Sequence, residues 1–489
     1  MVEDKNHDTE AAALQTTPSP VPYSIFTRAQ KALIVTIISV AATFTAFASN
    51  IYFPAIPTIA RDLSVTPELL NLTVTSYMIF QGLSPTLWGA IADARGRRFA
   101  FICTFLVFLG ACIGLAESRH YYQLLILRCL QSSGSASTVA LGAGVLGDIT
   151  TREERGGYMG IFQAGLLVPL AFAPVLGGVF AGTLGWRAIF WFLTIYSGVF
   201  LIVLILFLPE TLRSLVGNGS IPAKGLAESP MAYMQRRRQE KLAPESAQAQ
   251  QESTATKNKA RIDFLGPLRI LFGKEAICII LFLSIYYTVW QMTVAAMSTL
   301  FEQTYHLTQI QTGLTYISNG VGCILGTLTT GKFLDLEYRR IKAKHNGPTD
   351  EFPIEYARLR TMWLWAAMQC ASVIAFGWTI DKHVHISVPI ISTFFIGWAE
   401  IAIQAATSTF LVDIFPKQSA SATAALNLSR CLMGAGGTAA IIPLANAISV
   451  GWSFTLCTAI MIFSLLLLGM QMRCGPRWRA ARDKSESEG

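Results

Sequence analysis

The sequence predicts an all-α membrane protein with twelve transmembrane helices in two pseudo-symmetric halves of six. Three observations lead to this fold class. The 489-residue chain is 52% apolar and only 14% charged, whereas soluble domains carry about a quarter charged residues. Apolar runs of about twenty residues, long enough to cross a hydrocarbon core of roughly 30 Å, follow one another along the chain. A charged motif and a Gly-Trp pair each occur twice, once in each half.

Each apolar run is a predicted span. The spans of the first half lie at 32–54, 70–91, 98–117, 121–146, 157–181 and 187–208. Those of the second half lie at 275–299, 311–333, 360–380, 387–412, 420–447 and 452–472. The stretch between the halves is too polar to build a core. The predicted organisation is a disordered N-terminal tail (1–31), a six-helix bundle (32–208), a cytoplasmic linker (209–274), a second six-helix bundle (275–472) and a cytoplasmic tail (473–489).

Basic side chains gather on one side of these spans. That side holds the loop at 95–98, the Arg236–Arg238 run, the loop at 339–344 and the Arg-rich C-terminal end, and the opposite loops hold few. By the positive-inside rule, both termini and the linker face the cytoplasm. The net charge of +8 fits basic loops beside a lipid bilayer, so no nucleic-acid partner is expected.

The cysteines give no sign of a metal or disulfide framework. Eight of the nine lie inside apolar runs, and no pair has CxxC or other ligand spacing. No nucleophile–base pair, HExxH or Asp-rich metal motif lies in or beside a span. We therefore expect no metal, no bound cofactor and no enzymatic activity.

The repeats indicate two halves of the same orientation. Gly89-Ala-Ile-Ala-Asp93-Ala-Arg-Gly-Arg97-Arg98 recurs as Gly331-Lys-Phe-Leu-Asp335-Leu-Glu-Tyr-Arg339-Arg340, 242 residues later (331 − 89). Gly185-Trp186 recurs as Gly451-Trp452. Parallel repeats of this kind are found in secondary transporters, where the substrate site lies between the halves near the middle of the membrane. The sequence therefore predicts a transporter.

Charged residues inside spans are costly and are functional candidates. Glu400 is central in its span, with Gln404 one turn further along the same face. A carboxyl group at that depth suits reversible protonation, because desolvation disfavours its charged form. Arg430, in the middle of another span, is a candidate partner for Glu400. Asp148 carries a proton or anchors an interface with Arg155, and a purely structural role stays open for each of these residues.

The motifs resemble the major facilitator superfamily across all twelve spans. Gly89-x3-Asp93-x2-Gly96-Arg97-Arg98 resembles its signature between the second and third spans. Arg128-Cys-Leu-Gln131-Ser-Ser-Gly134 resembles its span-four motif, with Ser132 in place of a glycine. The segment from Gly165 to Gly178 resembles its antiporter motif in span five, with Ala173 replacing the glycine before Pro174.

Finer motifs resemble the fungal drug:proton antiporter group with twelve spans. They include Ser49-Asn50-Ile-Tyr52-Phe-Pro54 after span one, Glu154-Arg155-Gly156, Leu208-Pro-Glu210-Thr and the segment from Ala420 to Gly437. The set resembles both the quinidine-resistance multidrug exporters and the fungal citrate exporters. It does not choose between those two branches.

The resemblance implies roles for particular residues. It implies a role in proton coupling for Arg128, whose counter-charge is left open because the first span offers only Asn50. Asp148 and Glu400 join it as candidates for proton coupling because they are charged residues inside spans, and Glu400 belongs to no family motif. Adaptable amide and aromatic groups suit amphipathic organic ligands. The expected substrate-cavity residues are Gln81, Gln131, Gln163, Trp290, Gln291, Asn319, Gln404, Asn427 and Arg430. The expected gating residues are Gly89, Asp93, Arg97, Arg98, Asp335, Gly165, Pro169, Pro174, Gly177 and Gly178.

The function implied is a proton-coupled efflux transporter of a fungal plasma membrane. It would export drugs or endogenous secondary metabolites by alternating access, as a monomer that uses the proton gradient. The alternative is an organic-acid exporter of the citrate type. The fifth span, Ile161 to Val179, carries no cation for such an anion, while Arg128 and Arg430 keep the alternative open. An internal membrane also stays open.

Overall fold

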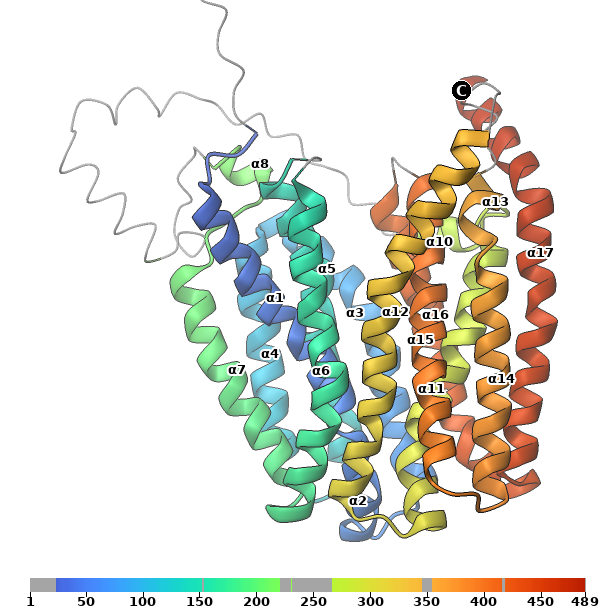
Figure 1. Ribbon diagram of the computed structural model, residues 1–489. Helices are drawn as coiled ribbons and strands as arrows, with labels where there is room; N and C mark the ends of the chain where they lie inside the picture. The colour runs from blue at the N-terminus through green and yellow to red at the C-terminus, as the bar shows by residue number, and fades with distance from the viewer. Residues whose placement is uncertain are drawn as a thin grey trace, which may run out of the picture.

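The protein is a bundle of long helices in which one helix corresponds to each predicted span (Figure 1). The computed structural model describes residues 23–151, 154–219, 266–344, 354–415 and 418–488, together with Pro230. The long helices of the first half are α1 (Arg28–Asn50), α3 (Pro67–Arg95), α4 (Arg97–Ala116), α5 (Tyr121–Ile149), α6 (Arg155–Thr183) and α7 (Arg187–Phe207). Those of the second half are α11 (Ile277–Tyr305), α12 (Gln309–Lys344), α14 (Met362–Asp381), α15 (Ser387–Ile414), α16 (Ser419–Ile448) and α17 (Val450–Glu488). The short elements are η1 (Phe53–Ala55), α2 (Ile56–Asp62), α8 (Arg213–Val216), α10 (Gly266–Leu271) and α13 (Ile354–Leu359).

Three of the long helices are more polar than the rest. Among the described residues, nine helical segments have both the length and the hydropathy that a membrane span needs, and α3, α5 and α12 are not among them. Helix α5 shows why, because it buries Arg128, Gln131 and several serines and threonines. Polar side chains are tolerated at membrane depth when they face the interior of a bundle or a cavity. The low hydropathy of α5 is thus explained by the polar side chains that it turns toward the interior of the bundle.

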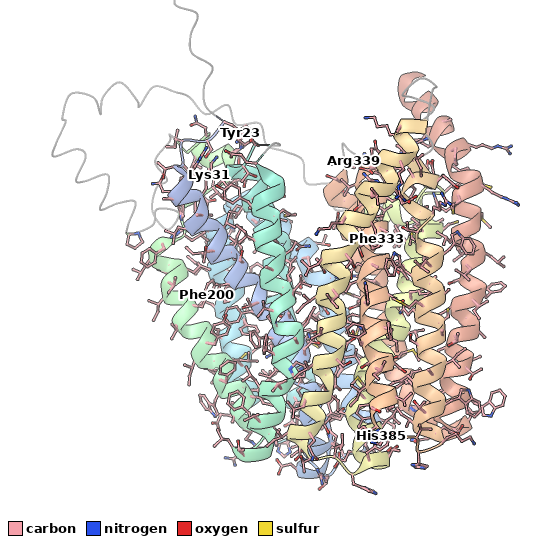
Figure 2. All side chains as sticks on the ribbon, in the orientation of Figure 1. Tyr23, Lys31, Phe200, Phe333, Arg339 and His385 are labelled. Carbon is pink, nitrogen blue, oxygen red and sulfur yellow. The ribbon has the colours of Figure 1, made fainter. Side chains whose placement is uncertain are left out.

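The two halves form separate bundles that touch at one end. In Figure 1 they lie close together near α2 and stand apart at the opposite end, where α17 finishes. Lys31 and Arg339 lie at the open end and His385 at the closed one (Figure 2). At the closed end, Arg61 Nη2 lies 3.1 Å from Glu302 Oε1, and Asn446 Nδ2 donates to Glu68 Oε1 across 2.8 Å. The hydrogen bonds and ion pairs between described residues of the two bundles lie at this end or reach inward to the middle of the helices.

Aromatic rings fill the core of the first bundle. Phe44 of α1 stacks on Tyr196 of α7 with 4.2 Å between ring centroids, and Phe105 of α4 meets Phe44 edge-on at 5.0 Å. Such pairs stabilise packing by about 0.5–1.5 kcal/mol beyond the area that they bury. These contacts tie α1, α4 and α7 together, so the first bundle can move as one body.

The segments outside the spans differ in part from the prediction. Helix α17 runs on to Glu488, although the sequence predicts that the bundle ends at 472 and a tail follows. The first described residues lie against the C-terminal end of α5, because Tyr23 Oη donates to Gly147 O across 3.0 Å. Arg213 at the start of α8 lies 3.5 Å from the centroid of the Tyr23 ring. The Arg236–Arg238 run and most of the predicted tail at 1–31 lie outside the described residues.

Candidate functional site

A polar cavity of about 430 Å³ lies between the two bundles. Four helices of the first half (α1, α3, α5 and α6) and four of the second (α11, α12, α15 and α16) supply its wall. The residues that line it are Thr45, Ala46, Ser49, Asn50, Gln81, Val139, Gln163, Leu166, Leu167, Leu170, Tyr287, Trp290, Gln291, Thr327, Ile401, Gln404, Ala405, Ser408, Thr409 and Arg430. Each half contributes ten of these residues, so the cavity lies between the two halves.

The wall is rich in amides and hydroxyls but carries little charge. Of the described residues that line the cavity, Arg430 alone is charged. Its Nε and Nη2 donate to Asn427 Oδ1 at 3.3 and 3.0 Å, and its guanidinium lies 4.9 Å from the centroid of the Tyr287 ring. Asn427 Nδ2 donates in turn to Gln81 O, across the two bundles. Arg430 is therefore held in place by neighbours from α11 and from its own helix.

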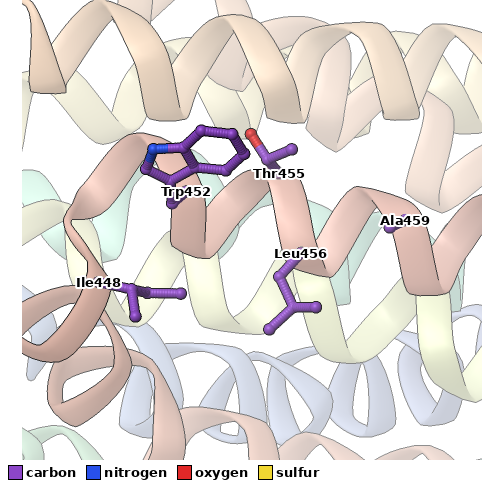
Figure 3. A pocket seen from close by; sticks show the side chains of 5 residues that line it. All are labelled: Ile448, Trp452, Thr455, Leu456 and Ala459. Carbon is purple, nitrogen blue, oxygen red and sulfur yellow. The ribbon is translucent and has the colours of Figure 1, made fainter.

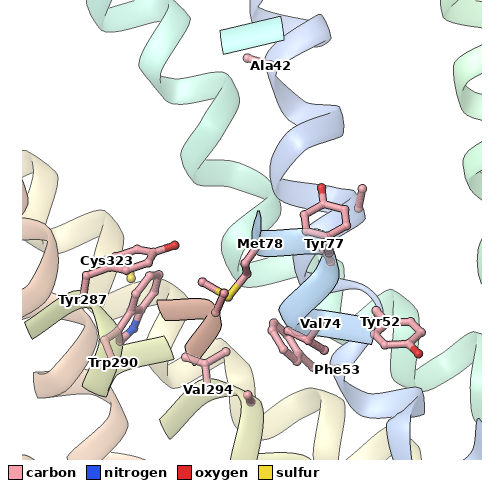
Figure 4. Packing of buried hydrophobic residues seen from close by; sticks show 14 of the residues in the cluster. Ala42, Tyr52, Phe53, Val74, Tyr77, Met78, Tyr287, Trp290, Val294 and Cys323 are labelled. Carbon is pink, nitrogen blue, oxygen red and sulfur yellow. The ribbon is translucent and has the colours of Figure 1, made fainter. Parts of the chain in front are cut away.

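Most of the residues expected in a substrate cavity lie on this wall. Those placed there are Gln81, Gln163, Trp290, Gln291, Gln404 and Arg430. Asn427 supports Arg430 rather than lining the cavity. Two expected residues lie elsewhere: Gln131 is fully buried beside Arg128, and Asn319 accepts a hydrogen bond from Trp290 Nε1 at 3.0 Å behind the wall. Figure 4 shows Tyr287 and Trp290 of α11 side by side, with Met78 of α3 facing them.

Sequence reasoning missed several hydroxyl residues of the wall, including Thr45, Ser49, Ser408 and Thr409. A signal for them exists in the spacing. Thr45 and Ser49 are four residues apart on α1, as are Gln404 and Ser408 on α15, and residues at this spacing share one helix face. A polar stripe on an otherwise apolar span indicates a face turned toward a cavity.

Arg128 lies inside the first bundle and is completely buried. Its Nη1 donates to Ala48 O at 3.0 Å and to Gln131 Oε1. The guanidinium lies 4.4 Å from the centroid of the Tyr52 ring and 4.2 Å from that of Tyr77. Its Nε and Nη2 have no hydrogen-bond partner among the described residues. Two aromatic faces thus take the place of the counter-charge, because their quadrupoles attract a cation.

Glu400 is buried inside the second bundle, behind the cavity wall. Its Oε2 accepts a hydrogen bond from Gln369 Nε2 at 3.4 Å. No donor from the described part of the chain reaches Glu400 Oε1 or Gln369 Oε1. Arg430 was the expected partner of Glu400, but its guanidinium is bonded to Asn427 instead. Glu400 is thus a fully buried carboxyl group with a single hydrogen bond from a described residue.

The open end of the first bundle holds an ion cluster. Arg97 at the start of α4 lies 2.7 Å from Asp93 and 3.2 Å from Asp148. The Glu210 carboxylate accepts the backbone N–H groups of Arg97 and Arg98 at 2.8 and 3.2 Å. A carboxylate there satisfies unpaired amides and complements the helix dipole. The side chain that caps α4 is thus Glu210, and the expected gating residue Asp93 pairs with Arg97 beside it.

Gly96 makes this capping possible. Its φ is +112°, a conformation that favours glycine, and a Cβ at this position would collide with the Glu210 carboxylate. On the same side of the bundle, Lys31 Nζ lies 2.7 Å from Glu154 Oε2. This ion pair lowers the pKa of the exposed Glu154 carboxyl below its ordinary value.

The second bundle also has ion pairs at the open end, on α12 and between α13 and α15. Helix α12 continues through Arg339 and Arg340, and Arg340 pairs with Glu337 on the exposed surface of the same helix. The side chain of Asp335 lies outside the described residues. Another ion pair joins α13 to α15. Arg358 Nε of α13 lies 2.8 Å from Asp413 Oδ2 of α15. Both clusters end in the same local sequence, Leu-x-Asp-Ile, at Asp148 and at Asp413.

Helix α6, which holds most of the expected gating glycines and prolines, contacts the backbone of helices in both bundles at its glycines. A Cβ at Gly165 would collide with Ser39 O, and one at Gly177 with Ile51 O, so α6 touches the backbone of α1 and the residue after it. Gly178 meets α12 of the other bundle, where a Cβ would lie 3.2 Å from Gly313 Cα. Pro169 and Pro174 lie within α6 and remove backbone donors from it. Gly89, another expected gating residue, has open space around it.

Two further observations bear on other kinds of site. Within the described part of the chain, no group of three or more His, Cys, Asp or Glu side chains is placed to hold a metal ion. A second hollow, on the outer surface of α16 and α17, is lined by Ile448, Trp452, Thr455, Leu456 and Ala459 (Figure 3). Its only polar side chain, Thr455, donates to Gly451 O of its own helix. Of the two hollows, the one between the bundles is therefore the candidate site for a polar ligand.

Comparison with known proteins agrees with this geometry. The family model of the Major Facilitator Superfamily matches residues 38–438. The chain is 39% identical to Citrate exporter 1 of Aspergillus niger, over 99% of this chain and 95% of that one. It is 34% identical to the MFS antiporter QDR2 of Candida albicans, over 91% and 89% of the two chains.

Solved structures share the fold at low sequence identity. A bacterial homologue of the human lysosomal transporter Spinster, in an inward-facing and unoccupied conformation, gives a TM-score of 0.64 at 12% identity, over 93% of this chain and 99% of that chain. The xylose transporter XylE of E. coli, in a partially occluded inward-open conformation, gives 0.61 at 15% identity, over 90% and 98%.

Proposed function

Because the chain belongs to the Major Facilitator Superfamily, we propose that it is a proton-coupled transporter that exports small organic compounds by alternating access. The compounds would be drugs or the organism's own metabolites, and the membrane would be the plasma membrane with both termini in the cytoplasm. The observation that carries the proposal is the polar cavity of about 430 Å³ at the interface of two bundles that touch at one end only. On this orientation, the cavity faces the cytoplasm and is ready to load a compound for export.

Proton coupling needs a group that gains and loses a proton close to the substrate. Glu400 fits this need, because it lies one helical turn from Gln404 on the cavity wall and its carboxyl has no cation bonded to it. Arg128 and Asp148 are weaker candidates for the group that carries the proton. Arg128 is enclosed by Tyr52 and Tyr77, and Asp148 is paired with Arg97 at the inner end.

A second candidate function is the export of organic acids. The observation that favours it is Arg430 on the cavity wall, which supplies a cation from α16 where the fifth span has none. The similarity to Citrate exporter 1 over nearly the whole chain points the same way. Both functions share one transport mechanism and differ in the class of substrate.

The test is substrate-driven proton flux in sealed vesicles that contain the purified protein. Lipophilic drugs and citrate are compared for the wild type, for Glu400→Gln and for Glu117→Gln, a matched control at the exposed outer end of α4. We expect flux with at least one compound, lost in Glu400→Gln and kept in Glu117→Gln. Flux that no compound drives would refute the transport proposal, and flux unchanged by Glu400→Gln would refute the role of Glu400.

A further inference from the structure

Glu400 and Gln369 form a pair of buried side chains inside the second bundle. Glu400 lies on α15 and Gln369 on α14, and both are fully buried. The amide nitrogen of Gln369 donates to Glu400 Oε2 at 3.4 Å and to the backbone oxygen of Tyr286 on α11 at 3.2 Å. The pair is therefore held where three helices of the bundle meet.

The contact with Tyr286 fixes which way the Gln369 amide faces. A backbone carbonyl oxygen can only accept hydrogen bonds, so the atom turned toward Tyr286 O must be the amide nitrogen of Gln369. That nitrogen carries two hydrogens, and Tyr286 O and Glu400 Oε2 account for both. The carbonyl oxygen of Gln369 must therefore find its donor elsewhere.

One oxygen of each side chain has no donor from the described part of the chain. These atoms are Glu400 Oε1 and Gln369 Oε1. Both belong to fully buried side chains, where an acceptor left without a donor is costly. A carboxylate has no hydrogen to offer, whereas a protonated carboxyl group has one O–H donor. A proton on Glu400 is thus able to bridge the two side chains.

The other titratable groups around Glu400 act on it differently. Arg430 of α16 interacts with Glu400 electrostatically, but the hydrogen bonds of its guanidinium go to Asn427. The remaining groups that interact with Glu400 come from α11 and α12 and are uncharged at neutral pH; they are Tyr286, Tyr287 and Cys323. Among the described residues, Gln369 is the one whose side chain is hydrogen-bonded to the carboxyl group.

We propose that Gln369 is the positioning residue for the proton on Glu400. When Glu400 carries a proton, its O–H donates to Gln369 Oε1 while Gln369 Nε2 still donates to Glu400 Oε2, so that acid and amide are joined by two complementary hydrogen bonds. The proton comes from water and returns to water, and only the O–H bond of Glu400 forms and breaks. The inference rests on the proposed function, in which Glu400 binds and releases a proton.

This arrangement connects the proton to the cavity wall. Gln369 is bonded to the backbone of Tyr286, and the next residue, Tyr287, lines the cavity. A change in the hydrogen bonds of Gln369 therefore acts on α11, one residue away from the wall. Glu400 itself is one helical turn from Gln404 on the same wall.

Infrared difference spectroscopy tests the pair without any substrate. The full-length protein in phosphatidylcholine vesicles is titrated over the pH range in which it stays folded, and the C=O stretching band of protonated carboxyl groups is followed. The band that is missing in Glu400→Gln belongs to Glu400. Its frequency reports the hydrogen bonds of the carboxyl group, because a carboxyl group that loses hydrogen bonds absorbs at higher frequency.

Gln369→Leu removes the amide and keeps an apolar side chain in its place. We expect the Glu400 band to move to higher frequency in this variant. Gln471→Leu is the matched control, because Gln471 of α17 is also a buried glutamine whose Nε2 donates to a backbone carbonyl, that of Glu275. In Gln471→Leu the band should stay at its wild-type frequency.

A measurement on the wild type does not depend on whether Gln369→Leu folds. Protein with isotope-labelled glutamine side-chain carbonyls should show a glutamine C=O band that changes together with the Glu400 band. The reason is that Gln369 Oε1 gains a hydrogen bond when Glu400 gains its proton. In Glu400→Gln the glutamine band should no longer respond to pH in this way.

The outcomes separate this inference from the proposed function. A Glu400 band that is unmoved in folded Gln369→Leu would show that water or another group holds the proton, and it would overturn the inference while leaving the role of Glu400 intact. A glutamine band that stays fixed while Glu400 titrates would do the same. If no carboxyl band is lost in Glu400→Gln, both the inference and the proton-binding role of Glu400 fail, and export is then judged by the flux assay alone.

Discussion

Gly178 of α6 and Gly313 of α12 meet backbone to backbone where the two bundles touch. A Cβ on Gly178 would lie 3.2 Å from Gly313 Cα, and a Cβ on Gly313 would lie 2.7 Å from Pro174 O. Gly320, two turns further along α12, meets Ala171 in the same way. Small residues at such crossings let helices approach closely. This row of contacts closes one end of the cavity and must separate when the transporter changes state.

Gly178→Ala should therefore shift the transporter away from the state described here. An inserted methyl group at a close contact costs about 1–3 kcal/mol, which changes the ratio of two states by about 5- to 150-fold. We expect slower transport and a longer distance between spin labels at Arg119 and Lys382 at the closed end.

Gly160→Ala is the matched control on the same helix, because a Cβ there meets nothing within 4 Å. It should leave both the transport rate and the label distance unchanged. An unaltered label distance in Gly178→Ala would contradict the assignment of this contact as a closure.

The ion pair of Arg358 with Asp413 should matter more than that of Arg340 with Glu337. The Arg358 side chain is 12% exposed and that of Arg340 is 62% exposed. Arg358→Gln leaves a partly buried carboxylate without its partner and should cost about 1–3 kcal/mol. Arg340→Gln should stay within about 0.5 kcal/mol. Thermal unfolding of both variants in detergent checks this. Equal decreases in stability would contradict the greater importance of the Arg358–Asp413 pair.

The pair of Lys31 with Glu154 should make stability depend on acidic pH. The pKa of Glu154 is lowered from 4.5 by its hydrogen bond to Lys31. A lowered folded-state pKa means that the pair stabilises the protein above pH 4.5 and stops doing so as the pH falls through the folded-state value. Glu154→Gln should thus lower the melting temperature at pH 7 and have no effect near pH 3. A constant difference across that range would show that the charge of Glu154 is not what matters.

Replacing Arg128 should separate its transport role from its structural one. Arg128→Met keeps much of the volume and removes a buried charge that has no carboxylate partner, so the variant should be about as stable as the wild type. Arg128→Ala should cost about 2–5 kcal/mol, because it leaves a cavity. We expect proton-coupled flux to be lost in both. Wild-type flux in a stable Arg128→Met protein would show that this cation has no part in coupling.

Much of the fold follows from the sequence alone, because hydrophobic length is a local property. Each predicted span corresponds to a long helix, including α3, α5 and α12, which fall short on hydropathy. Residues on the cavity wall such as Gln163 and Gln404 could also be anticipated, since an amide inside an apolar run must face something polar. The sequence does not show which amides line the cavity and which lie inside one bundle. Gln131 and Asn319 are amides in spans too, but each is bonded to another side chain inside its own bundle.

The sequence by itself determined the number of helices, their division into two bundles and the kinds of side chain available to a site. Tertiary structure alone decided which charges meet. It paired Arg430 with Asn427 rather than Glu400, enclosed Arg128 between two tyrosines, and gave Asp413 the partner Arg358. The physical reason is the distance along the chain over which each property is determined. Whether an apolar run forms a membrane span depends on residues that are close in sequence. A side-chain contact of 3 or 4 Å depends instead on how whole helices are rotated and shifted against one another.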